Sequence, residues 1–168
     1  LGGGGGVATV ASERVAVSVD TETGGIVFAD KQGNIMLRDK DYGTQFTPRD
    51  DAGRPSFEVR QAFLLDSAEV IYGLGQQQTG LVSQRNQRLL LRNQNMSICI
   101  PFVHSAKGYG LYWDNYSPTT FTDNPQEMSF DSEVGDCADY YFIYGGTADG
   151  VIAGVRALTG QAPMYPLW

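Results

Sequence analysis

Basic side chains are few in this sequence, and long apolar runs are missing. Its 168 residues include 12 lysines and arginines against 19 aspartates and glutamates, which gives a net charge of −7. Because this charge repels phosphate groups and no basic run offers a local exception, nucleic acid is not an expected partner. No apolar stretch approaches the roughly 20 residues that cross a bilayer, so no membrane span is expected.

Cysteine is also scarce, with two residues in the chain. Cys99 and Cys137 could form one disulfide, but a single pair makes neither a disulfide scaffold nor a C-x-x-C metal site. Free cysteine is among the most buried residue types, and Cys99 lies in an apolar run. We therefore favour buried free thiols over a disulfide.

The chain has one histidine, His104. Ser105 follows it on an expected strand, where neighbouring side chains point to opposite faces, so the two cannot form a nucleophile and base pair. His104 also has no nearby Cys, Asp or Glu with which to bind a metal. The G-x-G at residues 73–75 lacks the third glycine and the helix of a nucleotide-binding loop. We expect no metal site, no cofactor, and a hydrogen-bonded core or turn position for His104.

Helical periodicity is confined to one late segment, after Asp149. Thr147 is predicted as its N-cap and Gly160 as its end. Elsewhere short β-forming runs alternate with turn residues, as in consecutive hairpins. The expected strands are residues 14–20, 26–30, 35–38, 56–65, 69–72, 88–92, 97–104, 109–114, 128–130 and 139–144. Residues 39–55 are predicted to be a polar segment with a loop at 50–55. The predicted fold is all-β, mainly an antiparallel β-sandwich, with one short C-terminal helix.

The glycine-rich start of the chain has few side chains to pack. Residues 1–12 are predicted to be a flexible leader, because glycine loses the most backbone entropy when it is ordered. Residues 13–162 are predicted to form a single β-sandwich domain, since the chain is 42% hydrophobic and long enough to bury a substantial core.

Carboxylate groups are the remaining route to acid–base chemistry within the chain. The candidate groups are Asp50 with Asp51, Asp131 with Glu133 and Asp136, and Asp20 with Glu22. Each lies in a turn-rich polar stretch, where aspartate serves local backbone hydrogen bonds. A general acid needs a desolvated pocket that raises its pKa, and no such pocket is indicated around them. We interpret all three groups as solvated loops.

Aromatic side chains gather after residue 108. They are Tyr109, Tyr112, Trp113, Tyr116 and Phe121. Such rings beside amides and carboxylates suit the faces and hydroxyls of sugars. Alternatively, Tyr109, Leu111 and Trp113 share one face of a strand and form core. The pattern alone leaves both interpretations open.

Four segments, in order, resemble the N-terminal β-sandwich domain of glycoside hydrolase family 31, the alpha-glucosidase and alpha-xylosidase family. They are EVIYGLGQ at 69–76, IPF with SAKGYGL within 100–111, DYYFIYG at 139–145 and LTGQAPMYPLW at 158–168. The resemblance runs from about residue 13 to the final tryptophan. It implies a galactose-mutarotase-like sandwich and, at residues 163–168, the start of a linker to a (β/α)8 catalytic barrel outside this chain.

The family resemblance also implies a division of labour. Family members are retaining enzymes whose two catalytic aspartates lie in the barrel, so no catalytic residue is expected in this chain. The chain alone should therefore be inactive, as the non-catalytic N-terminal domain of an alpha-xylosidase or alpha-glucosidase that acts on plant-derived oligosaccharides. The implied partners are its own barrel and a carbohydrate substrate. Use of plant polysaccharide suggests a bacterial periplasm or cell surface.

One loop of the sandwich reaches over the barrel mouth in the family and helps form the substrate pocket. In this sequence it falls on residues 92–96, and we expect Asn93, Gln94 and Asn95 to bind sugar hydroxyls. This short amide-bearing loop, with Tyr112-Trp113-Asp114-Asn115, is similar to the alpha-xylosidase branch.

Two other functions are alternatives for an isolated sandwich, and the sequence argues against both. A stand-alone carbohydrate-binding module would use the aromatic cluster, but it would not need the family-like segment at 158–168. A mutarotase-type enzyme would need a histidine and carboxylate set, which one histidine cannot supply.

Overall fold

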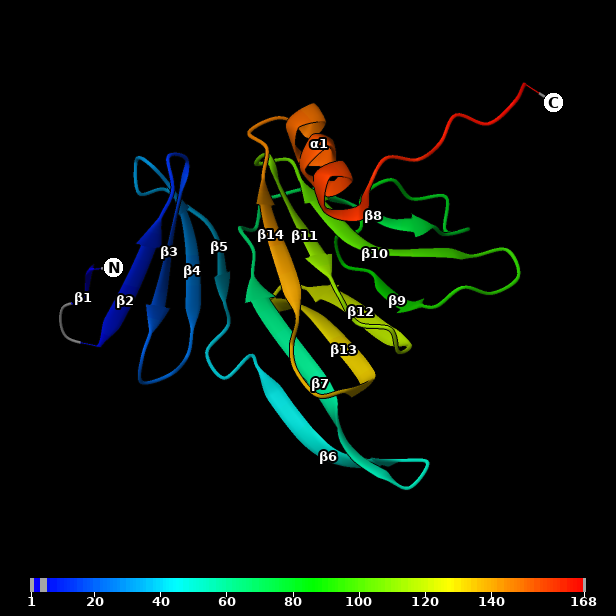
Figure 1. The fold of residues 1–168 in the computed structure, drawn as a ribbon, viewed down its shortest axis with the longest axis horizontal. Coiled ribbons are helices and arrows are strands. Elements are labelled where there is room, and N and C mark those ends of the chain that lie inside the picture. Colours follow the sequence, from blue (N-terminus) through cyan, green and yellow to red (C-terminus); the bar gives the residue numbers. More distant parts are fainter. Residues whose placement is uncertain (1, 4–5, 168) are drawn as a thin grey trace.

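The computed structural model describes residues 2–3 and 6–167, which form strands and one short helix (Figure 1). The strands are β1 Gly2–Gly3, β2 Val7–Ala11, β3 Val15–Asp20, β4 Ile26–Asp30, β5 Ile35–Asp39, β6 Gln45–Asp51, β7 Arg54–Leu64, β8 Ile71–Gln76, β9 Arg88–Leu91, β10 Ile98–Ser105, β11 Tyr109–Trp113, β12 Thr119–Asn124, β13 Glu127–Gly135 and β14 Tyr140–Tyr144. The helix is α1, Ala148–Thr159. The predicted all-β class with one short helix is confirmed.

The strands form two antiparallel sheets. The large sheet has the order β1-β2-β3-β4-β5-β7-β13-β12-β9, with β6 paired to β7, and the small sheet has the order β14-β11-β10-β8. Figure 1 shows β1 to β5, the first part of the large sheet, to one side of the region where the large sheet packs on the small sheet. β5 pairs with β7 through two residues, Arg38 opposite Leu64 and Asp39 opposite Phe63. The first five strands are therefore joined to the rest of the large sheet by a short ladder.

The core lies between the two sheets. Phe63, Phe121 and Phe130 come from the large sheet, and all three are fully buried. Trp113 of the small sheet stacks on Phe130, with ring centroids 5.4 Å apart and planes 12° from parallel. Its indole N–H donates to Ser132 Oγ at 2.9 Å, which satisfies the one polar atom that the ring brings into the core.

This packing decides between the two interpretations of the aromatic cluster. Tyr109, Leu111 and Trp113 are at most 1% exposed, as predicted for one core-facing strand face. The interpretation of the whole aromatic cluster as a sugar-binding surface is therefore wrong. Tyr112 lies on the opposite face of β11 and is half-buried. Tyr116 follows the end of β11 and is exposed.

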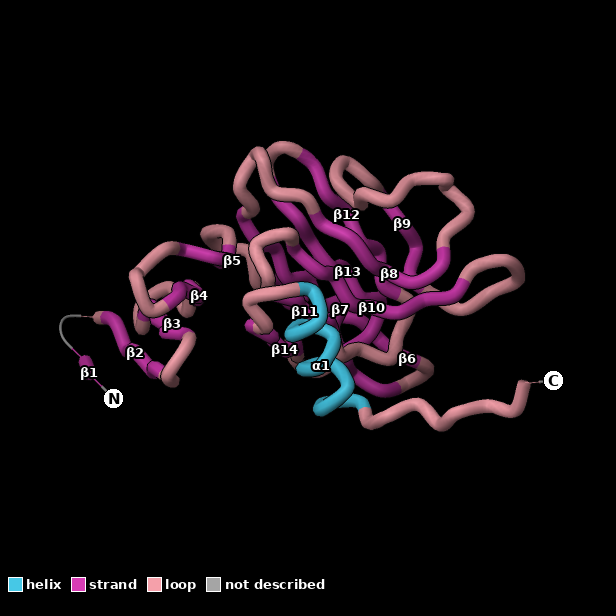
Figure 2. Tube along the Cα trace, turned by 90° about the horizontal axis from the view of Figure 1, so that it is seen from above, coloured by secondary structure: helices cyan, strands magenta, loops and turns pink. Residues whose placement is uncertain are grey.

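Helix α1 covers the outer face of the small sheet (Figure 2). Both predicted ends are confirmed: Thr147 Oγ1 accepts the N–H of Gly150, and Gly160 closes the last turn at φ 89°. The helix can approach closely because β11 has a glycine there. A Cβ on Gly110 would lie 2.8 Å from Val151 of α1 and 2.5 Å from the Phe102 ring. Within the described residues, no helix is long and apolar enough to span a membrane.

Three polar or glycine-rich segments differ from their sequence predictions. Residues 7–11 of the predicted leader form β2, which pairs with β3 from Val7 opposite Asp20 to Ala11 opposite Ala16. Leu1, Gly4 and Gly5 of that leader lie outside the described residues. Within predicted segment 39–55, β6 pairs with β7 along its whole length, although all its side chains are exposed. β12 was also missed, because Phe121 is its one large apolar residue.

The two cysteines are free thiols, as favoured from the sequence. Cys99 is partly buried and Cys137 is exposed, so the prediction of burial is wrong for Cys137. Cys137 follows the end of β13 and lies before β14, where the chain crosses from the large sheet to the small one.

Asp39 connects the first five strands to the small sheet. It ends β5, accepts the N–H of Ile26 at 3.2 Å and faces the Tyr140 hydroxyl of β14 at 3.5 Å. Burial raises the pKa of Asp39 to about 6, because the charged form is poorly solvated there.

This raised pKa predicts a pH-dependent stability. The contribution of protonated Asp39 is fully present below its unfolded pKa of 3.8 and is lost as the pH rises through about 6. Allowing for partial solvent screening, the free energy of unfolding should fall by about 1–2 kcal/mol through this group. Urea unfolding at pH 4 and pH 7 gives the change in the free energy of unfolding for each protein, and this change should be more negative in the parent chain than in Asp39→Asn by about 1–2 kcal/mol. Equal changes in the two proteins would contradict this assignment.

Candidate functional site

The segment that carries Asn93, Gln94 and Asn95 connects the two sheets. β9 is the edge strand of the large sheet, and β10 lies inside the small sheet, so the loop between them crosses at the margin of the sandwich. Figure 1 shows this crossing as a hairpin-like bend beyond β9 and β10. Gln94 and Ser97 exchange backbone hydrogen bonds of 3.2 and 3.1 Å, which closes a tight turn over the two residues between them.

The amide side chains of this turn are exposed, and two of them are partly used within the loop. Asn93 Oδ1 accepts the N–H of Cys99 at 2.8 Å, and Gln94 Oε1 accepts Arg92 Nε at 3.1 Å. The described residues offer no hydrogen bond to the Asn95 side chain. All three amide NH2 groups thus face solvent as potential donors, while Asn95 also keeps its acceptor.

Apolar side chains lie within the turn and on both of the strands beside it. Met96, Ile98 and Ile100 are 64%, 52% and 50% exposed, and Leu90 of β9 is 44% exposed. Met96 has a φ of 67°, a left-handed conformation that costs an L-residue roughly 1–2 kcal/mol. The loop therefore combines outward amides, unburied apolar side chains and a strained backbone at its tip.

A buried carboxylate anchors the strands that carry this loop, and it was not identified from the sequence. The Glu69 side chain is fully buried just before β8. It accepts hydrogen bonds from Ser105 Oγ at 2.6 Å and from the Tyr109 hydroxyl, and it faces Lys107 Nζ at 3.1 Å. These three partners belong to the β10–β11 hairpin, so the Glu69 carboxylate binds side chains on both sides of the turn of that hairpin. Burial and the neighbouring Glu69 charge raise the pKa of Tyr109, which keeps its proton as a donor.

His104 and Ser105 point to opposite faces of β10, as predicted. Ser105 is fully buried and donates to Glu69, whereas the half-buried His104 ring lies 6.2 Å from that of Tyr72, centroid to centroid. His104 Nε2 is buried without a hydrogen-bond partner among the described residues, so the prediction of a fully hydrogen-bonded histidine is wrong. The pair does not form a nucleophile and base.

The candidate carboxylate groups fall into two kinds. Asp20 and Asp50 lie in the last residues of β3 and β6, not in loops, but each accepts a backbone N–H group of the turn that follows, which is the local role interpreted from the sequence. Asp131 differs, because it lies in β13, half-buried, and pairs with Arg60 of β7. Arg60 also pairs with Glu127, so Asp131 belongs to a cross-strand ion network and not to a loop. Throughout residues 2–3 and 6–167, no three His, Cys, Asp or Glu side chains group closely enough to hold a metal ion.

A sequence model of the Glycosyl hydrolase 31 N-terminal galactose mutarotase-like domain matches residues 1–122. The chain belongs to this family of N-terminal domains. It is 34% identical to an alpha-xylosidase of Saccharolobus solfataricus over 175 aligned residues, which cover 96% of this chain and 23% of that protein. This family 31 domain therefore corresponds to about a quarter of that relative's length.

Solved family 31 structures have the same fold. The alpha-xylosidase of Xanthomonas citri is 32% identical, with a TM-score of 0.70 over 73% of this chain and 13% of that one. An alpha-xylosidase from a soil metagenome, complexed with xylose, is 22% identical, with a TM-score of 0.88 over 98% of this chain and 27% of that one. The second similarity establishes the fold of the family 31 domain across nearly the whole chain.

The Glu69 cluster predicts a stability difference between two matched variants. Glu69→Gln replaces a buried, paired carboxylate and should lower the free energy of unfolding by about 2–3 kcal/mol. Glu58→Gln makes the same change in an exposed ion pair with Arg49 and should cost less than about 0.5 kcal/mol. Urea unfolding followed by tryptophan fluorescence measures both. Equal losses would show that Glu69 does not anchor the hairpin.

Proposed function

We propose that this chain is the non-catalytic N-terminal domain of a retaining alpha-xylosidase that acts on plant-derived oligosaccharides. The observation that carries the proposal is its similarity, over almost its whole length, to one part of a larger alpha-xylosidase. Catalytic aspartates would lie in a (β/α)8 barrel encoded beyond residue 162, about 5–5.5 Å apart as retention requires. Residues 163–168 would begin the linker, and the protein would work in a bacterial periplasm or at the cell surface.

The domain would have two tasks toward its barrel. Its exposed apolar side chains in and beside the loop, Met96, Ile98 and Ile100, would pack against the barrel and lose their contact with water. The amides of Asn93, Gln94 and Asn95 would then lie at the mouth of the barrel, where they would donate to sugar hydroxyls. In the isolated chain these amides would exchange hydrogen bonds to water for hydrogen bonds to sugar with little net gain in free energy. The loop alone should therefore bind sugar weakly.

Expression of the gene continued past Trp168 tests the proposed activity. The protein extended to the length of its relatives should release xylose from an aryl alpha-xyloside faster than glucose from the matching alpha-glucoside. The 168-residue chain should release neither. Preference for the alpha-glucoside would overturn the proposed substrate. The absence of a following barrel with two suitably placed aspartates would overturn the proposed glycosidase activity.

Loop variants of the extended protein test the substrate contact. Gln94→Ala and Asn95→Ala should each lower kcat/KM for the xyloside about 3- to 10-fold, as expected for the loss of one neutral hydrogen bond. Gln32→Ala is the matched control, because Gln32 is an exposed amide in the turn between β4 and β5. The contact is disproved if the loop variants match the control.

Calorimetry on the 168-residue chain separates this function from that of a stand-alone binding module. Titration with xylose and xyloglucan oligosaccharides should give a Kd on the order of millimolar or weaker. Micromolar affinity would identify a binding module instead.

A further inference from the structure

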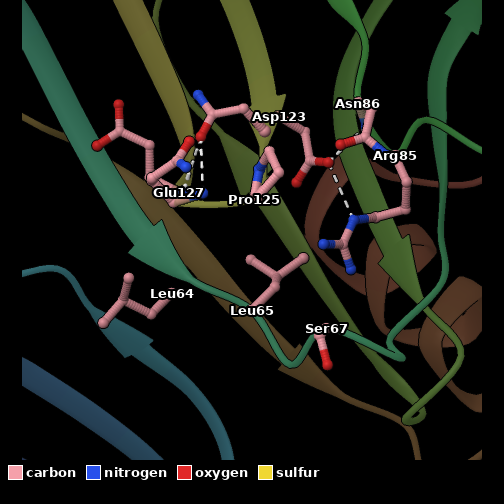
Figure 3. A pocket seen from close by; sticks show the side chains of 10 residues that line it. Leu64, Leu65, Ser67, Arg85, Asn86, Asp123, Pro125 and Glu127 are labelled. Atoms are coloured by element: carbon pink, nitrogen blue, oxygen red, sulfur yellow. Dashed lines mark hydrogen bonds and ion pairs between the residues drawn. The ribbon is translucent and has the colours of Figure 1, made fainter.

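The charged groups of the pocket where β7 ends are paired with one another or with neighbouring side chains (Figure 3). Asp123 is paired with Arg85, and Glu127 is paired with Lys40 and Arg60. Asp123 Oδ1 receives no hydrogen bond from the described residues, but it is buried, so a ligand in the pocket could not reach it. None of these groups points to a particular ligand.

A different hollow runs along β14, the strand of the small sheet that lies nearest to β1–β5 (Figure 1). It consists of two pockets of about 520 and 430 Å³, which share Val17, Phe28 and Phe142 in their linings. The first pocket continues to Tyr144 and the second to Ala138, so together they follow β14 over its whole length. We call this hollow the β14 groove.

The large sheet extends past β14 with an apolar face that nothing in the described chain covers. One row of side chains crosses this face from β5 to β2, each directly opposite the next: Leu37, Phe28, Val17 and Val10. Leu37 is 0% exposed and Phe28 is 7% exposed. Val17 is partly buried, and Val10 is 60% exposed. Phe28 stacks on Phe142 of β14 with ring centroids 4.2 Å apart, so burial falls off where the small sheet ends.

The free edge of β14 carries unpaired backbone groups. Asp139 and Gly145, which flank the strand, form backbone hydrogen bonds of 3.0 Å to residues at the two ends of β11. Bonded and non-bonded positions alternate along an antiparallel pair, so positions 140, 142 and 144 turn their N–H and C=O groups away from β11. No strand of the described residues pairs with this edge. Such an edge is a template for a further strand.

One added strand would satisfy the edge and cover the apolar row together. Paired strands lie about 4.8 Å apart and packed sheets about 10 Å apart, so a strand beside β14 would lie over β3. Every second side chain of that strand would point at Val15, Val17 and Phe28. The β14 groove therefore favours an extended segment with apolar residues at alternate positions.

A second copy of this chain fits the groove poorly. Within each copy Phe28 stacks on Phe142, and the Phe63 ring meets that of Tyr140 edge-on, with centroids 5.3 Å apart. The inner face of β14 is thus already covered. Pairing two β14 edges would place the β2–β3 part of each copy in space that the large sheet of the other copy fills. The occupant must bring a strand whose inner face is free.

The longer parent protein can supply such a strand, because this chain corresponds to 23% of its Saccharolobus solfataricus relative. β1 lies at the outer edge of β1–β5, whereas residues 160–167 lead away on the opposite side of the molecule (Figures 1 and 2). From β1 the groove is about 10 Å along the sheet and about 10 Å across to the other layer, which roughly six extended residues span. A segment before residue 1 would therefore start close to the groove.

We propose that the β14 groove holds a strand from the segment that precedes residue 1 in the parent protein. This strand pairs with β14 and packs alternate apolar side chains on β3. Like the proposed function, the proposal rests on the chain being part of a longer protein. The barrel would follow residue 162 and this strand precedes residue 1, so either proposal can fail without the other.

Hydrogen exchange of the full-length gene product, resolved to single residues, tests the pairing. With an empty groove the amides of residues 140, 142 and 144 would exchange fast, and those of 141 and 143, which bond to β11, slowly. A filled groove should slow the first three by about 100-fold or more, to the range of the other two. A remaining alternation would overturn the proposal, as would a gene without an alternating apolar segment before residue 1.

Deletion of the segment before residue 1 tests the identity of the occupant. The fast and slow alternation should return at residues 140–144 of the shortened protein. Five slow amides after the deletion would show that the barrel or a second copy fills the groove, and would overturn the proposal.

Matched variants of the full-length protein give a test that does not depend on the folding of the shortened one. Val10→Thr places a hydroxyl on the face that the strand covers and should speed exchange at residue 142 about 3- to 10-fold. Val7→Thr makes the same change on the opposite face of β2, where Val7 is 41% exposed, and should leave that exchange unchanged. Equal effects of the two variants would refute the assignment.

Discussion

The buried carboxylate of Glu69 is the contact on which the arrangement of the small sheet depends. It lies just before β8 and accepts hydrogen bonds from Ser105 and Tyr109, at the two sides of the β10–β11 turn. Arg85 donates to the Glu69 carbonyl and to the Asp123 carboxylate of the large sheet, so one polar network joins both sheets. Because β8 and β11 flank β10, this network fixes the strand from which the amide loop emerges. The same arginine also shapes the pocket around Asp123.

Features with local causes could be predicted from the sequence. The cap at Thr147 and the end at Gly160 depend on residues within one turn of α1, and both were found correctly. Strands with a core-facing apolar face, such as β11, were found because Leu111 and Trp113 alternate with outward residues. Polar strands carried no such signal: β6 pairs with β7 without burying a side chain, so its pattern resembles that of a loop.

Features with distant partners could not be predicted from the sequence. Glu69 meets Ser105 and Tyr109 across 36 and 40 residues of chain, and nothing near Glu69 in the sequence signals a buried role. Asp123 lacks a partner for Oδ1 only because of how its turn and Arg85 are placed in space. The exposed amides of the loop could be located from the family resemblance, yet the contact with sugar that we propose for them would depend on a surface beyond this chain.

The most direct test of the central claim is a crystal structure of the extended protein with xylose bound. At least one of Gln94 and Asn95 should lie within about 3 Å of a sugar hydroxyl, with Met96 and Ile98 buried against the barrel. A bound xylose whose contacts all come from the barrel, with the loop exposed to solvent, would contradict the proposed role of the loop.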